Sequence, residues 1–196
     1  MNFVSYGPMK VAVIGGVSRL QTSTRYSAEA LRLGELLARK GVHTVCSGSR
    51  SGLVGEVMEG VARGSGPLTA IVLCESDERG NLHPYVSDAT YVESVGARKT
   101  AMVQLADGFI ALPGGIGTHD EILTVLAESK VRVHNRPLVM INVAGFFDPL
   151  LAMVEHMVRT GFLSARHLGN VVLEPNAESA LAALESRCRS AGSTPR

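Results

Sequence analysis

The stretch GFIALPGGIGTHDEILTVLAESKV, residues 108–131, joins an apolar run to a helical pattern through a glycine-rich turn. Residues 108–112 are apolar enough for a buried strand, and residues 119–131 have the pattern of a helix. The segment 113–118 between them, with one Pro and three Gly, favours neither structure. A strand that leads through a tight turn into a helix is the unit from which parallel α/β sheets are built, so this stretch predicts the fold class.

The same alternation extends in both directions from this stretch. Further apolar runs that predict strands are residues 11–15, 42–46, 68–74, 89–93, 137–143 and 170–174. Patterns that predict helices are residues 25–41, 52–64, 96–106, 148–161 and 176–190, with Gly41 as a stop signal and Asp148 as a cap. Because the strands are apolar throughout and separated by helices, we predict an α/β fold: a doubly wound Rossmann-type parallel sheet with helices on both faces. We expect a single domain over residues 1–196, with its core at 9–175 and flexible ends at 1–8 and 190–196.

The composition narrows the classes of function. A hydrophobic content of 45% with 19% charged residues is that of a globular protein, and a net charge of +1 argues against binding nucleic acid through bulk charge. No apolar run reaches the roughly 20 residues that a membrane span needs. The three cysteines, Cys46, Cys74 and Cys188, form no CxxC, and residues 1–10 do not resemble a signal peptide. We therefore expect a cytoplasmic protein that binds neither nucleic acid nor membrane.

Three turns of unusual composition follow predicted strands: GGVS at 15–18, SGSRSG at 47–52 and PGGIGT at 113–118. In a parallel α/β sheet such turns share the carboxyl edge of the strands, where ligands bind. Free amides at a helix N-terminus favour an anion, and glycine lets the backbone approach it closely. One such turn is weak evidence, but three on one edge predict a phosphate-bearing ligand. The turns contain neither GxGxxG nor GxxxxGK[ST], which argues against a dinucleotide site and a P-loop.

Two pairs of polar residues near the third turn each allow two interpretations. Thr118 and Glu121 have the T-x-x-E spacing of a capping box, in which both serve the helix itself. Alternatively, Glu121 is a carboxylate beside an anion site that faces a sugar hydroxyl or a developing positive charge. Arg98 and Lys99 are either part of a solvated helix face or close to the third turn.

The segment PGGIGTHDE, residues 113–121, resembles the PGGxGTxxE signature of the LONELY GUY (LOG) family, and Arg98 with Lys99 lies upstream at the family's separation. The similarity extends over residues 11–174. Members are described as cytokinin-activating phosphoribohydrolases, and many bacterial relatives were once labelled lysine decarboxylases. The resemblance implies hydrolysis of the N-glycosidic bond of a nucleoside 5′-monophosphate, which releases a free base and ribose 5-phosphate. We expect no cofactor, since the sequence makes no case for pyridoxal phosphate, and no metal, since the histidines lack ligand spacing.

By this resemblance Arg98 and Glu121 are the catalytic pair. Glu121 would contact the ribose hydroxyls and stabilise the oxocarbenium-like charge, while the permanently protonated Arg98 would act as a hydrogen-bond donor and electrostatic clamp. The residues expected to bind substrate are Lys99, Gly114, Gly115, Ile116, Gly117, Thr118, Gly16, Ser18, Gly48 and Arg50. Relatives are commonly dimers with the site near the interface, so we expect a homodimer.

The chain departs from the family pattern at several positions. Val95 and Gly96 replace a Met-His pair, Ser47 and Ser49 stand in the second turn, and Val17 replaces a common Ser. We expect these positions to shape the base end of the pocket, which favours a purine or pyrimidine monophosphate other than an isoprenoid-adenine nucleotide. Arg50 is either a second contact to phosphate or base, or a solvated loop cation.

Two other functions stay open. One is a deoxyribosyltransferase-like enzyme in which Glu121 attacks the sugar covalently. The other is a non-catalytic nucleotide-binding or carrier protein.

Overall fold

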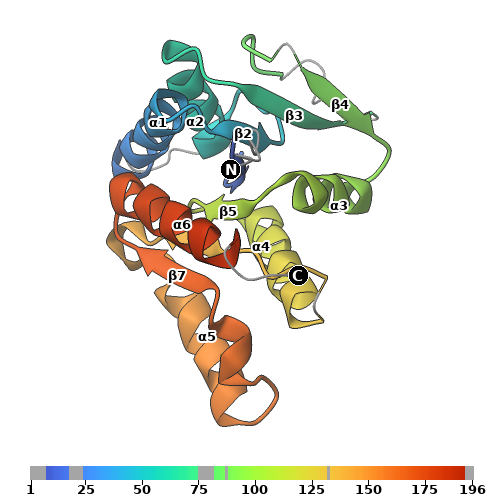
Figure 1. The fold of residues 1–196 in the computed structure, drawn as a ribbon, viewed down its shortest axis with the longest axis vertical. Helices are drawn as coiled ribbons and strands as arrows, with labels where there is room; N and C mark the ends of the chain where they lie inside the picture. The colour runs from blue at the N-terminus through green and yellow to red at the C-terminus, as the bar shows by residue number, and fades with distance from the viewer. Residues whose placement is uncertain (1–7, 18–23, 75–81, 87, 132, 193–196) are drawn as a thin grey trace, which may run out of the picture.

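The structure is a computed structural model that describes residues 8–17, 24–74, 82–86, 88–131 and 133–192. Within these residues the chain forms a seven-stranded sheet with the order β4-β3-β2-β1-β5-β6-β7, and every neighbouring pair is parallel. Figure 1 shows the course of the chain through this sheet. The strands are β1 (Lys10–Ile14), β2 (His43–Cys46), β3 (Leu68–Leu73), β4 (Ala89–Val92), β5 (Gly108–Ala111), β6 (Leu138–Ile141) and β7 (Val171–Glu174). The helices are α1 (Thr24–Arg39), α2 (Gly52–Arg63), α3 (Val95–Leu105), α4 (Ile116–Lys130), α5 (Asp148–Arg159) and α6 (Ala177–Gly192), with 3-10 turns η2 (Val143–Gly145) and η3 (Ala165–Leu168).

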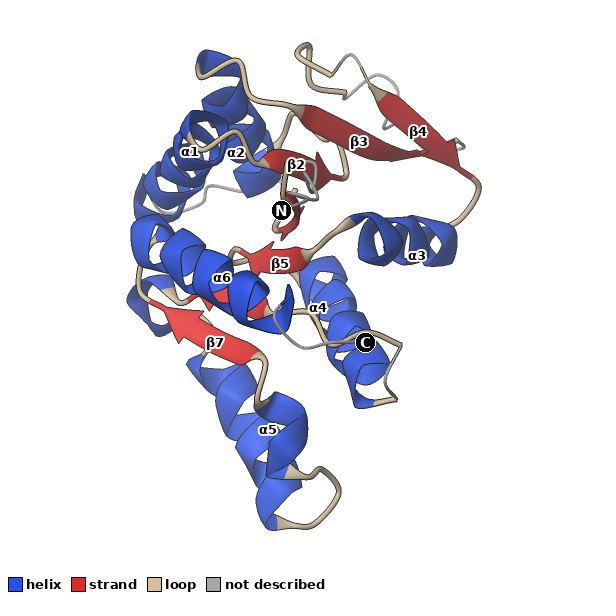
Figure 2. Cartoon of the chain, in the orientation of Figure 1, coloured by secondary structure: helices blue, strands red, loops and turns tan. Residues whose placement is uncertain are grey.

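The helices cover both faces of the sheet, as Figure 2 shows. Successive residues of a strand point to opposite faces, so Val11 and Val13 of β1 pack in one core cluster while Ala12 and Ile14 pack in the other. The first cluster also contains buried residues of α1, α2 and α6, and the second contains buried residues of α3, α4 and α5. The predicted doubly wound α/β sheet is therefore confirmed.

Helices α1 and α2 pack unusually closely through glycine. A Cβ atom on Gly34 of α1 would lie 2.0 Å from the carbonyl oxygen of Val57, and one on Gly60 of α2 would lie 2.3 Å from that of Leu31. Because no side chain separates the two backbones, α2 is held firmly, and with it the turn between β2 and α2. The glycine content of residues 52–64 thus serves close packing.

The capping-box alternative for Thr118 and the predicted Asp148 cap are both wrong. Helix α4 begins at Ile116 with Gly115 as its N-cap, so Thr118 lies inside the first turn and cannot cap the helix. The capping-box interpretation of Thr118 and Glu121 fails for this reason. Likewise, Phe147 and not Asp148 is the N-cap of α5.

The physical reason at α5 is the turn before the helix, where a different side chain provides the hydrogen bonds. The Asn142 side chain accepts the Phe147 N–H at 2.7 Å and donates to the Asp148 carboxylate at 2.7 Å. The Asp148 carboxylate therefore accepts a hydrogen bond from the turn. Asp148 is the first residue of the helix and not its cap.

The ends of the chain differ in part from the expected boundaries. The buried core extends beyond residue 175, since Ala177, Ala180, Leu181 and Leu184 of α6 are each at most 1% exposed. Helix α6 continues to Gly192, so it includes the first residues of the segment 190–196 that was expected to be flexible. Residues 1–7 and 193–196 lie outside the described residues.

Candidate active site

The order of the strands reverses direction at the centre of the sheet, where β1 and β5 are neighbours. The chain leaves β1 toward β2 on one side and leaves β5 toward β6 on the other. The turns after these two strands therefore diverge and leave a crevice at the carboxyl edge, the usual place for a ligand in a doubly wound sheet.

The first glycine-rich turn is hydrogen-bonded at this crevice to the third turn and to the start of α2, which follows the second turn. The Gly16 N–H donates to the carbonyl of Pro113 at 3.1 Å, which joins the first turn to the third. The Gly16 carbonyl accepts the Leu53 N–H at 2.7 Å, which joins the first turn to the start of α2. One residue of the first turn thus sets the spacing of all three segments.

This close approach of three backbones explains two of the glycines. A Cβ atom on Gly114 would lie 2.1 Å from the Thr118 Oγ1 and 2.7 Å from the Gly16 nitrogen. Gly52 has φ +65°, and its Cβ atom would lie 2.4 Å from the Gly16 oxygen. Any side chain at Gly114 or Gly52 would push the turns apart.

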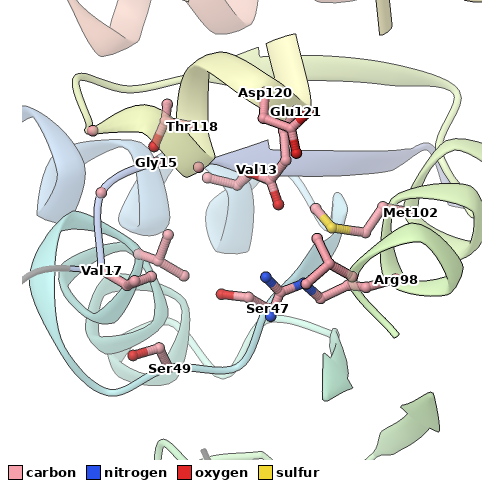
Figure 3. A pocket seen from close by; sticks show the side chains of 15 residues that line it. Val13, Gly15, Val17, Ser47, Ser49, Arg98, Met102, Thr118, Asp120 and Glu121 are labelled. Atoms are coloured by element: carbon pink, nitrogen blue, oxygen red, sulfur yellow. The ribbon is translucent and has the colours of Figure 1, made fainter. Parts of the chain in front are cut away.

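The turns border a cleft of about 290 Å³, shown in Figure 3. Its walls come from the end of β1 and the first turn, the turn between β2 and α2, helix α3, and the first turns of α4. The lining residues are Val13, Gly15, Gly16, Val17, Ser47, Ser49, Val54, Val95, Arg98, Met102, Gly115, Gly117, Thr118, Asp120 and Glu121.

Glu121 of α4 and Arg98 of α3 reach the cleft from different helices, and Figure 3 shows both side chains pointing into it. Burial of Glu121 raises the pKa of its carboxyl group to about 7. The neighbouring Asp120 carboxylate raises this pKa further, while the Arg98 and Lys99 cations pull it down without overcoming the effect of burial. A carboxyl group with such a pKa exchanges a proton near neutral pH, as a catalytic acid or base must.

Lys99 is held in an ion pair beside the cleft. Its Nζ lies 2.9 Å from both carboxylate oxygens of Asp120, which lies one position before Glu121. This pair ties α3 to α4 beside the cleft and leaves Asp120, but not Lys99, in the lining.

Six of the residues predicted from sequence lie in the lining: Gly16, Arg98, Gly115, Gly117, Thr118 and Glu121. Gly114 lies behind it, packed between Thr118 and Gly16. Ile116 points outward and is 90% exposed, and Lys99 lies in its ion pair. Gly48 packs beside Ala70 and Leu82, and Arg50 is exposed; neither is in the lining. Ser18 lies outside the described residues.

Of the positions that depart from the family pattern, Val17, Ser47, Ser49 and Val95 line the cleft and Gly96 does not. The Ser47 hydroxyl is buried there and finds no hydrogen-bond partner among the described residues. A buried hydroxyl without a hydrogen-bond partner is unfavourable, and a ligand with a polar group facing Ser47 would satisfy it.

Sequence reasoning missed four lining residues, which are Val13, Val54, Met102 and Asp120, and it included Gly15 only as part of the first glycine-rich turn. Met102 carried a usable signal, because it follows Arg98 by one helical turn and must share its face. Asp120 is the neighbour of Glu121 and was visible in the motif. Val13 and Val54 read as ordinary core residues, and no local pattern distinguishes them.

The described lining of the cleft contains no lysine; Lys99 lies beside it, in contact with Asp120. Among the residues with described positions, no three His, Cys, Asp or Glu side chains gather as metal ligands would. Nor is any helix of the described segments long and apolar enough to cross a membrane.

Comparison with known proteins supplies the family. A family model described as "Possible lysine decarboxylase" matches residues 54–184, which include both Arg98 and the complete PGGIGTHDE segment. The chain belongs to the LOG family. It is 34% identical over 160 residues to a probable cytokinin riboside 5′-monophosphate phosphoribohydrolase of Oryza sativa subsp. japonica, a match that covers 82% of this chain but 65% of the rice protein.

Two further relatives of the LOG family are named for the same activity. A cytokinin riboside 5′-monophosphate phosphoribohydrolase of Arabidopsis thaliana is 33% identical over 162 residues, covering 83% of this chain and 76% of that protein. One of Rhodococcoides fascians is 34% identical over 165 residues, covering 83% of each.

Solved structures share the fold. A molybdenum cofactor binding protein from Rippkaea orientalis has a TM-score of 0.72 at 21% identity, covering 93% of this chain and 98% of its own. The molybdenum cofactor carrier protein from Chlamydomonas reinhardtii has a TM-score of 0.73 at 17% identity, covering 93% and 99%. At these identities the likeness concerns the arrangement of the backbone alone.

Proposed function

We propose that this LOG-family chain is a nucleoside 5′-monophosphate phosphoribohydrolase, which hydrolyses the N-glycosidic bond to release a free base and ribose 5-phosphate. One observation carries the proposal: Glu121, with its raised pKa, and Arg98 face a single cleft bordered by interlocked glycine turns. The activity for which relatives that are 33–34% identical are named supports it.

The proposed binding mode follows the charges of the cleft. The 5′-phosphate binds at the N-terminus of α4, where first-turn amides and the helix dipole favour an anion. Gly115 and Gly117 allow a close approach, and no acidic residue lies in that first turn. Glu121 lies one helical turn further on, so a ribose attached to the phosphate extends toward its carboxylate.

In the proposed reaction the bond between C1′ and the base nitrogen breaks, and the base leaves with the electron pair and takes up a proton. Positive charge develops on the ribose ring, and the ionised Glu121 stabilises it and accepts a proton from the water that attacks C1′. Arg98 holds a fixed positive charge and donates hydrogen bonds to the substrate. Because the Glu121 pKa is about 7, a large share of the carboxyl groups is ionised at neutral pH.

The base end of the cleft supports a substrate other than an isoprenoid-adenine nucleotide. Val95, Met102 and Val17 provide apolar contacts for a planar base, and the Ser47 hydroxyl adds a polar group. We therefore place purine and pyrimidine monophosphates with polar exocyclic groups first among the substrates, and isoprenoid-adenine monophosphate after them.

The test is incubation with a panel of nucleoside 5′-monophosphates, followed by chromatography of the free base. We expect release by the wild type, and a loss of roughly 100-fold or more in Glu121→Gln and in Arg98→Ala. Circular dichroism checks that both variants are folded. Near-normal turnover in either variant would remove that residue from the mechanism. Binding without release would instead indicate a carrier, and base exchange or a trapped glycosyl-enzyme would indicate a transferase.

We also propose that the chain forms a homodimer through α4. Ile116, Leu123, Ala127 and Val131 recur at helical spacing along this helix and its C-cap, and all four side chains are exposed. The stripe begins beside the glycine turn, so a second copy docked on it would lie next to the cleft. Exposed apolar stripes of this kind are typical of interaction surfaces.

A further inference from the structure

His119 occupies one of the open positions of the PGGxGTxxE pattern, and neither the motif nor the lining of the cleft gives it a role. Its Nδ1 lies 2.9 Å from the carbonyl oxygen of Gly115, the N-cap of α4. The same carbonyl accepts the backbone N–H of His119 at 3.1 Å. Because a carbonyl oxygen only accepts, the imidazole must carry its proton on Nδ1 to make this bond.

The aromatic residues beside His119 restrict its ring. The ring centroids of Phe146 and Phe147 lie 6.2 and 6.1 Å from that of the imidazole. Phe146 and Phe147 pack edge to face at 5.1 Å, and Tyr26 of α1 packs against Phe146 at 5.9 Å. The imidazole therefore rests against a wall whose own position is set by α1 and by the turn before α5.

That wall is itself anchored by hydrogen bonds. Phe147 is fully buried, and its N–H donates to the Asn142 side chain, which also binds Asp148. A fixed wall restricts the imidazole rotamer and so lowers the entropy that the bond to Gly115 would otherwise cost.

The bond acts on the amide that faces the proposed phosphate. A peptide unit is planar and trans, so the Gly115 carbonyl and the Ile116 N–H point in opposite directions along one rigid plane. Holding the carbonyl along the helix fixes the Ile116 N–H outward at the N-terminus of α4. Gly115 has no side chain that could cap the helix or restrict its own backbone, so the bond from His119 adds to the main-chain bond that the same carbonyl accepts.

We propose that His119 is a positioning residue for phosphate binding, which orients the Ile116 amide through its hydrogen bond to the Gly115 carbonyl. The inference rests on the proposed function, since it assumes that a phosphate binds at this turn. The imidazole could matter as a hydrogen-bond donor or only through its packing. These two roles predict opposite orders of phosphate affinity for two variants.

The variants are His119→Asn and His119→Leu. Asparagine places a donor close to the position of Nδ1 but fills less of the aromatic wall, whereas leucine packs against the wall and has no donor. We measure binding of ribose 5-phosphate by calorimetry, and KM and kcat with the nucleoside 5′-monophosphate that the wild type hydrolyses fastest. His119→Gln, whose donor lies one bond further out, is the matched polar control.

We expect His119→Leu to weaken ribose 5-phosphate binding about three- to tenfold, the range for one lost hydrogen bond. Its KM should rise by a similar factor with kcat within about twofold, because the lost contact serves binding and not the reacting bond. His119→Asn should stay close to the wild type, and His119→Gln should resemble His119→Leu. Binding by His119→Leu equal to that of the wild type, or a greater loss in His119→Asn, would overturn the positioning role.

Failure of the proposed function looks different. A wild type that binds ribose 5-phosphate but releases no base would overturn the hydrolase, while the comparison of His119 variants would still decide the positioning role by calorimetry. A wild type that binds no ribose 5-phosphate would overturn both.

Discussion

The Glu121 carboxyl group is buried in surroundings that disfavour its ionised form. Burial raises the pKa to about 7 although two cations, Arg98 and Lys99, act in the opposite direction. The charge of Lys99 is partly neutralised by its ion pair with Asp120, which weakens the effect of Lys99 in lowering the Glu121 pKa. A residue whose ionised form is costly in the folded protein is more easily explained by chemistry than by stability.

The cost can be measured with Glu121→Gln. The carboxyl group has a pKa near its ordinary value of 4.5 in the unfolded chain and about 7 in the folded protein, so the folded state binds the proton more tightly. The ionised carboxylate therefore lowers stability above pH 7, progressively less down to pH 4.5, and not at all below it. We expect Glu121→Gln to be roughly 1–3 kcal/mol more stable than the wild type at pH 8, which raises Tm by about 2–4 °C per kcal/mol.

The measurement is thermal unfolding at pH 8 and at pH 4.5, where the difference should disappear. Glu155→Gln, at an exposed position of α5, is the control and should leave Tm unchanged at both pH values. A Glu121→Gln variant that is less stable than the wild type at pH 8 would show that the carboxylate serves the fold.

The glycine turns link elements that are distant in sequence. Gly16 bonds to Pro113 before α4 and to Leu53 in α2, so a displacement of one turn is transmitted to the other two. Gly114 is the tightest point of this contact, because a Cβ atom there would overlap both the Thr118 side chain and the Gly16 backbone. Interiors packed this tightly respond to an added carbon by shifting backbone, not by compressing.

Gly114→Ala and Gly117→Ala form a matched pair in the same turn. We expect Gly114→Ala to lose about 1–3 kcal/mol of unfolding free energy, the usual cost of overpacking. Gly117 is helical and a Cβ atom on it would meet nothing within 4 Å, so Gly117→Ala should be neutral or slightly stabilising. Urea unfolding measures both. Equal stability of the two variants would contradict the idea that the turns touch at Gly114.

The elements themselves could be predicted from the sequence to within a few residues, because apolar runs and helical spacing are local properties. The α1 face is an example: Ala30, Leu33 and Leu37 are buried as their spacing indicates. The predicted Asp148 cap was wrong and the capping-box alternative failed because competing local groups decide the caps: Gly115 begins α4 ahead of Thr118, and Asn142 satisfies the turn ahead of Asp148. A T-x-x-E spacing alone does not distinguish a cap from an interior pair.

The site could be predicted only where its residues belong to a recognisable sequence motif. Arg98, Glu121 and the glycines of the third turn could be selected from the motif, and they lie in the cleft lining or directly behind it. The roles of Val13, Val54 and Lys99 depend on which helix faces which strand, and on an ion pair between α3 and α4. These are consequences of packing in three dimensions that no local window contains.

The whole molecule brings a polar cleft and an apolar surface together on α4. Its buried side, with Ile122 and Val125, packs in the core, and Thr118 with Glu121 faces the cleft. Its outer side carries the stripe of Ile116, Leu123, Ala127 and Val131. One helix therefore has three distinct faces, and the third exposes four apolar side chains with the charged Asp120 and Lys130 beside them.

The homodimer can be tested through this third face. We expect light scattering with size exclusion to give twice the monomer mass for the wild type, and Leu123→Asp to shift the protein toward the monomer, because a buried carboxylate at the centre of the stripe costs several kcal/mol. Met153→Asp on α5 is the matched control, since Met153 is 43% exposed and Leu123 is 41% exposed. It should remain dimeric. A monomeric wild type would rule out the dimer, and an intact dimer in Leu123→Asp would place the interface on another face of the molecule.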